Sequence, residues 1–188
     1  MRYRLELSYL GRDFHGWQRQ PNAITVQQTI EDAFEIVFKD KLDVYGCGRT
    51  DTGVHAKQFF AHFHVDLDKA GFDTEKLSYK LNNFLNNDIA IFRIFRVNKD
   101  AHTRFEALSR TYAYRVSLEK SPFDQEYTYR SAIPRLDFEL MNKAAQLLFD
   151  YTDFTSFSKV GTDVKTNNCK IMKAVWKEEN GVWTFTIQ

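Results

Sequence analysis

The arrangement of apolar residues constrains the fold of this chain more than any other feature of its sequence. Apolar side chains alternate with polar ones over Tyr3–Tyr9, which predicts a half-buried strand. Over Val26–Phe38 they recur every three or four residues, as on the buried face of a helix. Thr25 precedes this segment and Gln28 follows three residues later, a pair typical of a capping box at a helix start.

The same two patterns continue through the first hundred residues. We expect a short strand near Leu42–Cys47 and another over Phe59–Val65, where apolar residues again alternate. Thr74 is expected to cap a second helix, and Ile89–Val97 is rich in Ile, Phe and Val, as in a well-covered strand. The order of elements is then βαββαβ, which is the split-βαβ or ferredoxin-like order.

The rest of the chain predicts a second, similar half. We expect a strand, a loop, a helix and two strands over residues 110–117, 121–135, 138–148, 169–176 and 182–188. Asn180-Gly181 lies between the last two strands and is a strong hairpin signal. The predicted fold is therefore α+β, with two ferredoxin-like, βαββ-type halves over residues 1–100 and 101–188. Their antiparallel or mixed sheets are expected to join, with an active-site cleft between the halves.

Composition excludes several classes of protein. Of the 188 residues, 43% are hydrophobic and only 3 are proline, so the chain has enough apolar area to fold. The 26 Lys and Arg against 25 Asp and Glu give a net charge of +1, which does not by itself indicate nucleic-acid or membrane binding. Two cysteines, no apolar run of membrane length and no signal peptide predict a cytoplasmic protein.

A glycine-rich loop is the sharpest local feature of the sequence. It reads Gly46-Cys47-Gly48-Arg49-Thr50-Asp51-Thr52-Gly53-Val54-His55-Ala56 and follows a predicted strand. Glycines let the backbone approach a ligand closely, and a cation at Arg49 would favour the ionised form of Asp51. A turn with a surface ion pair between these two residues is the alternative. The loop contains neither a Walker sequence nor a dinucleotide fingerprint.

Residues 48–56 resemble the catalytic loop of the tRNA pseudouridine synthase A family. Further segments match other motifs of that family, in the same order and over nearly the whole chain. They are Tyr9-Leu10-Gly11, Phe14-His15-Gly16-Trp17-Gln18-Arg19-Gln20, Val26-Gln27, His102-Thr103-Arg104-Phe105, Arg110-Thr111-Tyr112-Ala113-Tyr114 and Asp153-Phe154-Thr155-Ser156-Phe157.

This resemblance implies isomerisation of uridine to pseudouridine in the anticodon arm of tRNA, at positions 38–40, without a metal or organic cofactor. Asp51 corresponds to the family's indispensable carboxylate, and it either adds to C1′ of the ribose or removes the C2′ proton. Either role needs an ionised group, and Arg49 is the nearest cation in sequence. Members of the family are typically homodimers. A noncatalytic RNA-binding module of ferredoxin-like fold is the main alternative, and a purely structural protein is a third.

Tyr112 matches the family tyrosine beside the reacting base. Its ring would stack on uracil, and its hydroxyl is suited to moving the C5 proton. A core tyrosine on a strand is the alternative, because Tyr114 and Val116 share its face.

Several residues are candidates for binding RNA. Residues 93–115 carry six cations and two anions, a net charge of +4 interleaved with aromatic side chains, as suits phosphate contacts and stacking. Solvated strand edges are the alternative. Within this window the candidates are Arg104 and Arg110. Outside it they are Gln18, Arg19 and His55. Trp17, beside Gln18, is expected in the core.

Two further expectations concern metals and the end of the chain. His62 and His64 are spaced as a metal-binding pair on a strand, but exposed imidazoles opposite the apolar face explain them sufficiently.

The second half ends at βαββ, so a last αβ unit is expected to be missing. The resemblance implies a later Met-Val-Arg motif whose arginine contacts the catalytic carboxylate. We therefore expect the 188-residue chain to be truncated and poorly active.

Overall fold

The computed structural model describes residues 1–66, 71–124, 126–158 and 166–188, and the chain divides into two compact units. Unit 1 comprises Met1–Leu108 and unit 2 comprises Ser109–Gln188. The described part contains two four-stranded sheets and three α-helices, which confirms the α+β class. Each described helix is too short or too polar to cross a membrane.

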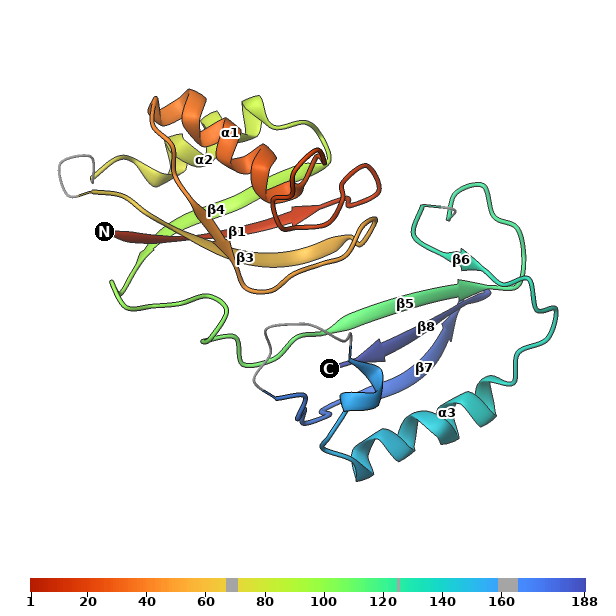
Figure 1. Cartoon of the computed structure of the whole chain (residues 1–188). Coiled ribbons are helices and arrows are strands. Elements are labelled where there is room, and N and C mark those ends of the chain that lie inside the picture. The colour runs from red at the N-terminus through yellow and green to blue at the C-terminus, as the bar shows by residue number, and fades with distance from the viewer. Residues whose placement is uncertain (67–70, 125, 159–165) are drawn as a thin grey trace. The chain divides into compact units, whose positions relative to one another are not determined.

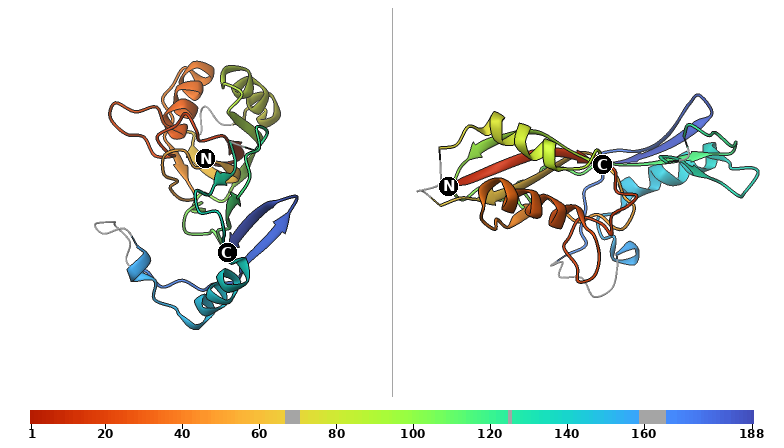
Figure 2. Two further views of the ribbon diagram at one scale, coloured as in Figure 1. Left: turned by 90° about the vertical axis from the view of Figure 1, so that its right-hand side faces the viewer. Right: turned by 90° about the horizontal axis from the view of Figure 1, so that it is seen from above.

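Unit 1 has the predicted order of elements, βαββαβ (Figure 1). The elements are β1 (Arg2–Tyr9), α1 (Val26–Phe38), β2 (Val44–Gly46), β3 (Ala56–His64), α2 (Thr74–Phe84) and β4 (Ile89–Val97). The sheet order is β2-β3-β1-β4, and every neighbouring pair is antiparallel. Both helices lie on the same face of the sheet, as the two orthogonal views in Figure 2 also show.

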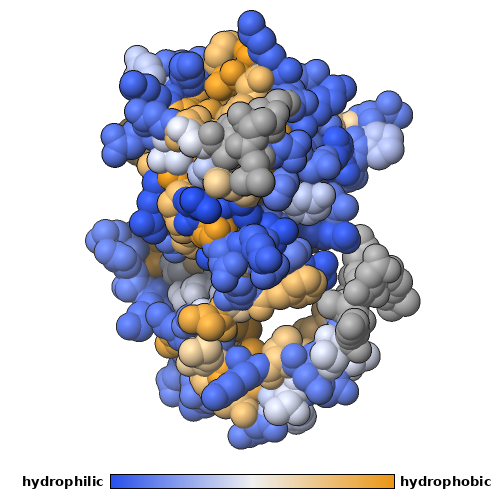
Figure 3. All heavy atoms as spheres, turned by 90° about the vertical axis from the view of Figure 1, so that its left-hand side faces the viewer, coloured by the Kyte–Doolittle hydropathy of each residue, from blue (hydrophilic) through white to orange (hydrophobic). Residues whose placement is uncertain are grey.

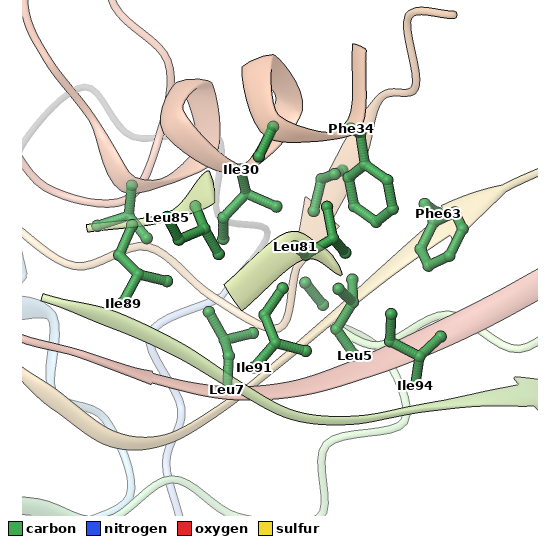
Figure 4. Packing of buried hydrophobic residues seen from close by; sticks show 14 of the residues in the cluster. Leu5, Leu7, Ile30, Phe34, Phe63, Leu81, Leu85, Ile89, Ile91 and Ile94 are labelled. Carbon is green, nitrogen blue, oxygen red and sulfur yellow. The ribbon is translucent and has the colours of Figure 1, made fainter. Parts of the chain in front are cut away.

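The core of unit 1 lies between this sheet and its two helices. Leu5 and Leu7 of β1 are fully buried, while the intervening residues of the strand are only partly covered. They pack beneath Ile30 and Phe34 of α1 and Leu81 of α2 (Figure 4). Burying side chains of this size contributes about 1.5–3 kcal/mol each, so the alternation seen in the sequence determines which face of the sheet receives the helices.

The two helix starts differ in how well the sequence predicts them. Thr25 caps α1, and its hydroxyl accepts a hydrogen bond from the amide of Gln28 (3.3 Å). The expectation that Thr74 caps α2 is wrong, because Asp73 is the N-cap. The Asp73 carboxylate accepts from the amides of Glu75 and Lys76, both at 3.0 Å. A carboxylate satisfies two amides there and also interacts favourably with the positive end of the helix dipole.

Unit 2 contains the second sheet and one α-helix. Its elements are β5 (Tyr112–Ser117), β6 (Tyr129–Arg130), α3 (Phe138–Leu147), β7 (Ala174–Glu179) and β8 (Val182–Ile187), with short 3-10 turns η2 (Leu148–Asp150) and η3 (Thr155–Phe157). The sheet order is β6-β5-β8-β7, and β6 is parallel to β5. The sequence predicts a loop where β6 lies, since a strand of two residues is too short to show a period.

The hairpin of unit 2 forms where Asn180-Gly181 predicts it. Both residues have positive φ, 53° and 79°, as this kind of tight turn requires. Strand β7 begins at Ala174 rather than at Cys169, because it pairs with β8 only over the six residues up to the turn. Phe138 of α3 stacks on Trp183 at 3.9 Å between ring centroids, which fixes the helix against this hairpin.

One face of the molecule carries both polar and apolar residues. In Figure 3 hydrophilic residues cover much of this face, and hydrophobic residues form patches between them. This distribution agrees with a chain in which 27% of the residues are charged.

Candidate functional site

The glycine-rich loop of unit 1 connects β2 to β3 and is held by contacts with both the sheet and itself. At its start, the amide of Cys47 donates to the carbonyl of Phe60 (2.7 Å). In its middle, the hydroxyls of Tyr9 and Thr50 form a hydrogen bond (2.9 Å). The amide of Val54 donates to the carbonyl of Asp51 (3.2 Å), which closes a turn around the candidate catalytic residue. The backbone of Asp51 is therefore fixed by its own loop.

A second loop, between β1 and α1, supports the first one through backbone atoms. The amide of Trp17 donates to the carbonyl of Thr50 (3.1 Å), and the amide of Gly53 donates to the carbonyl of Phe14 (3.2 Å). These two bonds bracket Asp51. Trp17 is 2% exposed and packs on Phe59 of β3 at 4.3 Å between centroids, which confirms that it is a core residue.

Two glycines make this close approach of the loops possible. A Cβ on Gly11 would lie 2.0 Å from the carbonyl oxygen of Val54, and a Cβ on Gly16 would lie 2.3 Å from that of Thr50. Gly16 also has a φ of +84°, which disfavours any side chain. These glycines therefore let the backbone of the loop between β1 and α1 pack directly against the backbone of the glycine-rich loop.

The side chains of Arg49 and Asp51 are both exposed. Within the described part of the chain, no ion pair joins them, so the surface ion pair considered from the sequence is not formed. The loop thus presents a solvent-facing carboxylate on a backbone that neighbouring residues hold. Such a group is placed to meet a ligand rather than to stabilise the fold.

Three polar residues in or next to this loop are candidates for binding RNA: Gln18, Arg19 and His55. Gln18 is exposed. Arg19 forms ion pairs with Glu31 and Asp43, both at 3.3 Å, and the buried Glu31 also accepts from the amide of Val44 (3.0 Å). His55 accepts a hydrogen bond at Nδ1 from the amide of Gly11 (3.0 Å). Arg19 and His55 therefore have partners within unit 1: Arg19 attaches the loop between β1 and α1 to α1 and to the segment before β2, and His55 joins the two loops.

Tyr112 is at the start of β5 in unit 2, opposite Ile187 of β8. Its side chain is 53% exposed, so the alternative that it is a core residue is wrong. Tyr114, two residues later on the same face, is similarly exposed at 54%. The start of β5 therefore presents two tyrosine rings to solvent.

The cations of the basic window lie in different surroundings. Arg93 pairs with Glu6 at 2.5 Å, and Arg115 pairs with Asp124 at 3.6 Å, so acids within the protein offset these two cations. Arg104 and Arg110 are exposed. The guanidinium of Arg104 lies over the ring of Phe105, 6.0 Å from its centroid.

The prediction for His62 is wrong, since this residue is 4% exposed while His64 is exposed as expected. Residues 101–106, which the sequence analysis groups with the second half, pack over His62 in unit 1. Burial, together with the nearby His102, Arg2 and Arg4, lowers the pKa of His62 to about 4. Within residues 1–66, 71–124, 126–158 and 166–188, no group of three His, Cys, Asp or Glu side chains is arranged to hold a metal ion.

Comparison with known proteins gives clear relatives. The chain is 51% identical over 188 residues to the tRNA pseudouridine synthase A of Parabacteroides distasonis, a match that covers all of this chain and 73% of the relative. It is 48% identical to that of Bacteroides fragilis, with the same coverage of both chains, and 35% identical over 182 residues to that of Clostridium acetobutylicum. No family model matches the sequence. At this identity and coverage, the chain belongs to the tRNA pseudouridine synthase A family.

Proposed function

We propose that this protein isomerises uridine to pseudouridine in the anticodon arm of tRNA, at positions 38–40, with ionised Asp51 as its reactive group. The family assignment supports the reaction and the substrate class. The exposed carboxylate of Asp51, on a loop held by backbone hydrogen bonds on both sides, is the observation that carries its role. A noncatalytic RNA-binding module has no use for such a carboxylate, because it repels phosphate.

As a nucleophile, Asp51 adds to C1′ of the target ribose. The N1–C1′ bond breaks as the new ester bond forms, and its electron pair leaves with the uracil as an anion. The base then turns over, C5 bonds to C1′, and the ester bond breaks to return the carboxylate. The C5 proton leaves and N1 gains a proton, so the product is an isomer of the substrate.

As a base, Asp51 removes the C2′ proton of the same ribose. The electron pair of the C–H bond forms a C1′–C2′ double bond as the N1–C1′ bond breaks, which leaves a glycal and a uracil anion. C5 then bonds to C1′ as the proton returns to C2′, and loss of the C5 proton together with protonation of N1 completes the isomerisation. Deuterium at C2′ of the target uridine slows turnover in this route only.

Two more residues are proposed to bind the substrate base and its surroundings. Tyr112 is exposed on β5, and its ring is available to stack on uracil while its hydroxyl moves the C5 proton. Arg49 is exposed two residues before Asp51, close enough in the chain for its cation to bind an adjacent phosphate.

Exposed polar residues are proposed to bind the rest of the tRNA. Arg104, Arg110 and Gln18 are suited to phosphate contacts, which depend on charge and hydrogen bonding rather than on sequence. Arg19 and His55 already have intramolecular partners, so their removal is expected to act through the loops that they hold. The resemblance also implies a homodimer, and the mass of the protein in solution tests this.

The experiment is pseudouridine formation in an unmodified tRNA, measured by mass spectrometry with the purified protein and two variants. The protein is kept in excess over tRNA, so that even a low activity of the parent is detected. Asp51→Asn is nearly isosteric and lies in an exposed loop, so we expect it to fold, to bind tRNA at least as well and to form no pseudouridine. Asp100→Asn, at another exposed aspartate of unit 1, is the matched control and should keep its activity. Appreciable product from Asp51→Asn would remove this residue from the mechanism.

A further inference from the structure

A short segment of unit 1 crosses the face of the sheet that the helices leave uncovered. This segment comprises residues 101–106, and polar contacts with three side chains of the sheet attach it. Arg2 of β1 donates to the carbonyl of Ala101 (2.5 Å), and Arg4 of β1 pairs with Glu106 (2.6 Å). Between these two, His62 of β3 bonds to Thr103.

The His62 contact is the buried one of the three. His62 and Thr103 are each 4% exposed, whereas Glu106 is exposed. The Nδ1 of His62 lies 2.8 Å from the hydroxyl of Thr103 and accepts from its amide at 3.4 Å. Because an amide only donates, Nδ1 is the acceptor and the ring proton is on Nε2, so this contact requires a neutral imidazole.

Two ring contacts hold the imidazole in place. Tyr45 of β2 stacks on it at 5.2 Å between centroids, and His102 meets it edge-on at 4.8 Å. His102 in turn packs against Phe105 at 4.3 Å. A series of ring contacts therefore leads from the sheet to the exposed end of the segment.

That exposed end carries two of the residues suited to RNA. The amides of Phe105 and Glu106 both donate to the carbonyl of His102 (3.0 Å each), and the amide of Arg104 donates to Nδ1 of His102 (3.3 Å). This turn holds Arg104 and Phe105 in solvent, Phe105 with 76% of its side chain exposed. Their orientation depends on His102 and Thr103, which both contact His62.

We infer that His62 is a positioning residue, which holds the segment of residues 101–106 on the sheet so that Arg104 and Phe105 meet the RNA in a fixed orientation. The inference rests on the proposed function, in which Arg104 contacts tRNA. A loose segment still carries the same charge, but it loses entropy on binding that a fixed one has already lost. His62 touches neither the RNA nor the reacting atoms in this role.

The test compares two substitutions of His62 by their dissociation constants for tRNA. His62→Leu removes the acceptor, while His62→Asn places an amide oxygen near the position of Nδ1. We expect His62→Leu to weaken binding about fivefold, and His62→Asn to stay within about twofold of the parent protein. Thr103→Val, which removes the hydroxyl partner with little change in shape, should behave like His62→Leu. Circular dichroism and the melting temperature verify that each variant is folded under the assay conditions.

A combined variant separates positioning from general damage to the fold. In a protein that carries both Arg104→Ala and Phe105→Ala, adding His62→Leu should change tRNA affinity little, since both residues that it positions are gone. Full additivity of the two losses would overturn the inference, and so would parent-like binding by folded His62→Leu. Unchanged binding by Arg104→Ala alone would instead refute the proposed RNA contact, and the positioning role with it.

Discussion

At the scale of single residues, burial separates the candidates that contact solvent from those that hold the structure. Asp51, Tyr112 and Arg104 are exposed, whereas His62 is buried on the open face of the sheet. The sequence indicates the first three through motifs. It does not indicate the burial of His62, because the segment that covers this residue lies some forty positions further along the chain.

The buried imidazole predicts a pH-dependent stability. Folding lowers the pKa of His62 from 6.5 to about 4, so the unfolded chain binds a proton between these values that the folded protein does not. The contribution of neutral His62 to the free energy of unfolding is therefore fully present above about pH 6.5. It is lost as the pH falls toward 4. Between pH 7 and pH 5 the loss is on the order of 1–2 kcal/mol.

Urea denaturation at several pH values measures this loss. His62→Asn keeps the charged groups around the site, namely Arg2, Arg4, His102 and Glu106, but lacks the titrating ring. The parent protein should therefore lose more stability than this variant between pH 7 and pH 5. Parallel curves for the two proteins would show that His62 does not titrate as described.

Substitutions of Tyr112 should separate stacking from proton transfer. Phenylalanine keeps the ring and should bind tRNA normally but turn over slowly, if the hydroxyl moves the C5 proton. Alanine should also lose the stack, which is worth about 1–3 kcal/mol per base. Tyr114→Phe, at an equally exposed tyrosine on the same face of β5, is the control and should leave turnover unchanged. Equal weakening of binding in both Tyr112 variants would instead indicate a structural hydroxyl.

At the scale of elements, the two loops that frame Asp51 act as one unit. Gly16→Ala places a methyl group 2.3 Å from the carbonyl oxygen of Thr50, so the loops must separate. We expect a loss of about 2 kcal/mol or more in stability and a loss of at least about tenfold in turnover, since displaced catalytic groups react slowly.

Gly53→Ala is the matched control for this prediction. Gly53 also has a positive φ, +79°, but a Cβ there meets nothing within 4 Å. Its cost should be the backbone strain of about 1–2 kcal/mol alone. Denaturation and single-turnover rates measure both variants. If Gly53→Ala slows turnover as strongly as Gly16→Ala, the contact between the loops is not what fixes Asp51.

The elements themselves follow the sequence where one side of the chain is buried. The alternating pattern predicts β1 to within one residue, because alternation records burial directly. Strand β4 has the predicted bounds, Ile89–Val97, which its Ile, Phe and Val content indicates. The two-residue β6 and the late start of β7 escape prediction, since pairing partners decide them rather than local pattern. The hydrogen bonds between the backbones of the two loops cannot be predicted from side-chain patterns. The glycines at positions 11 and 16 are the only indication of them in the sequence.

At the scale of the whole molecule, the net charge is only +1, but the cations are not spread evenly along the chain. Residues 93–115 carry six cations and two anions. We expect tRNA affinity to fall steeply with salt, because each phosphate contact releases counterions. Arg104→Ala should reduce the slope of log affinity against log salt by about one.

Arg93→Ala provides the control for this measurement. Glu6 already pairs with Arg93 at 2.5 Å, so its removal should change the slope little. Titrations of tRNA at four or five salt concentrations give all three slopes. An affinity that barely changes with salt would contradict the proposed phosphate contacts of the parent protein.

The backbone bonds between the two loops have a consequence for how this protein can change over generations. Trp17 and Gly53 hold the loops through amides, and amides are present whatever side chains neighbour them. Substitutions at exposed positions such as Arg12, Gln18 and Arg49 can therefore accumulate without moving the carboxylate of Asp51. Specificity for a different RNA is thus open to selection at these positions, while the frame that presents the reactive group is inherited intact.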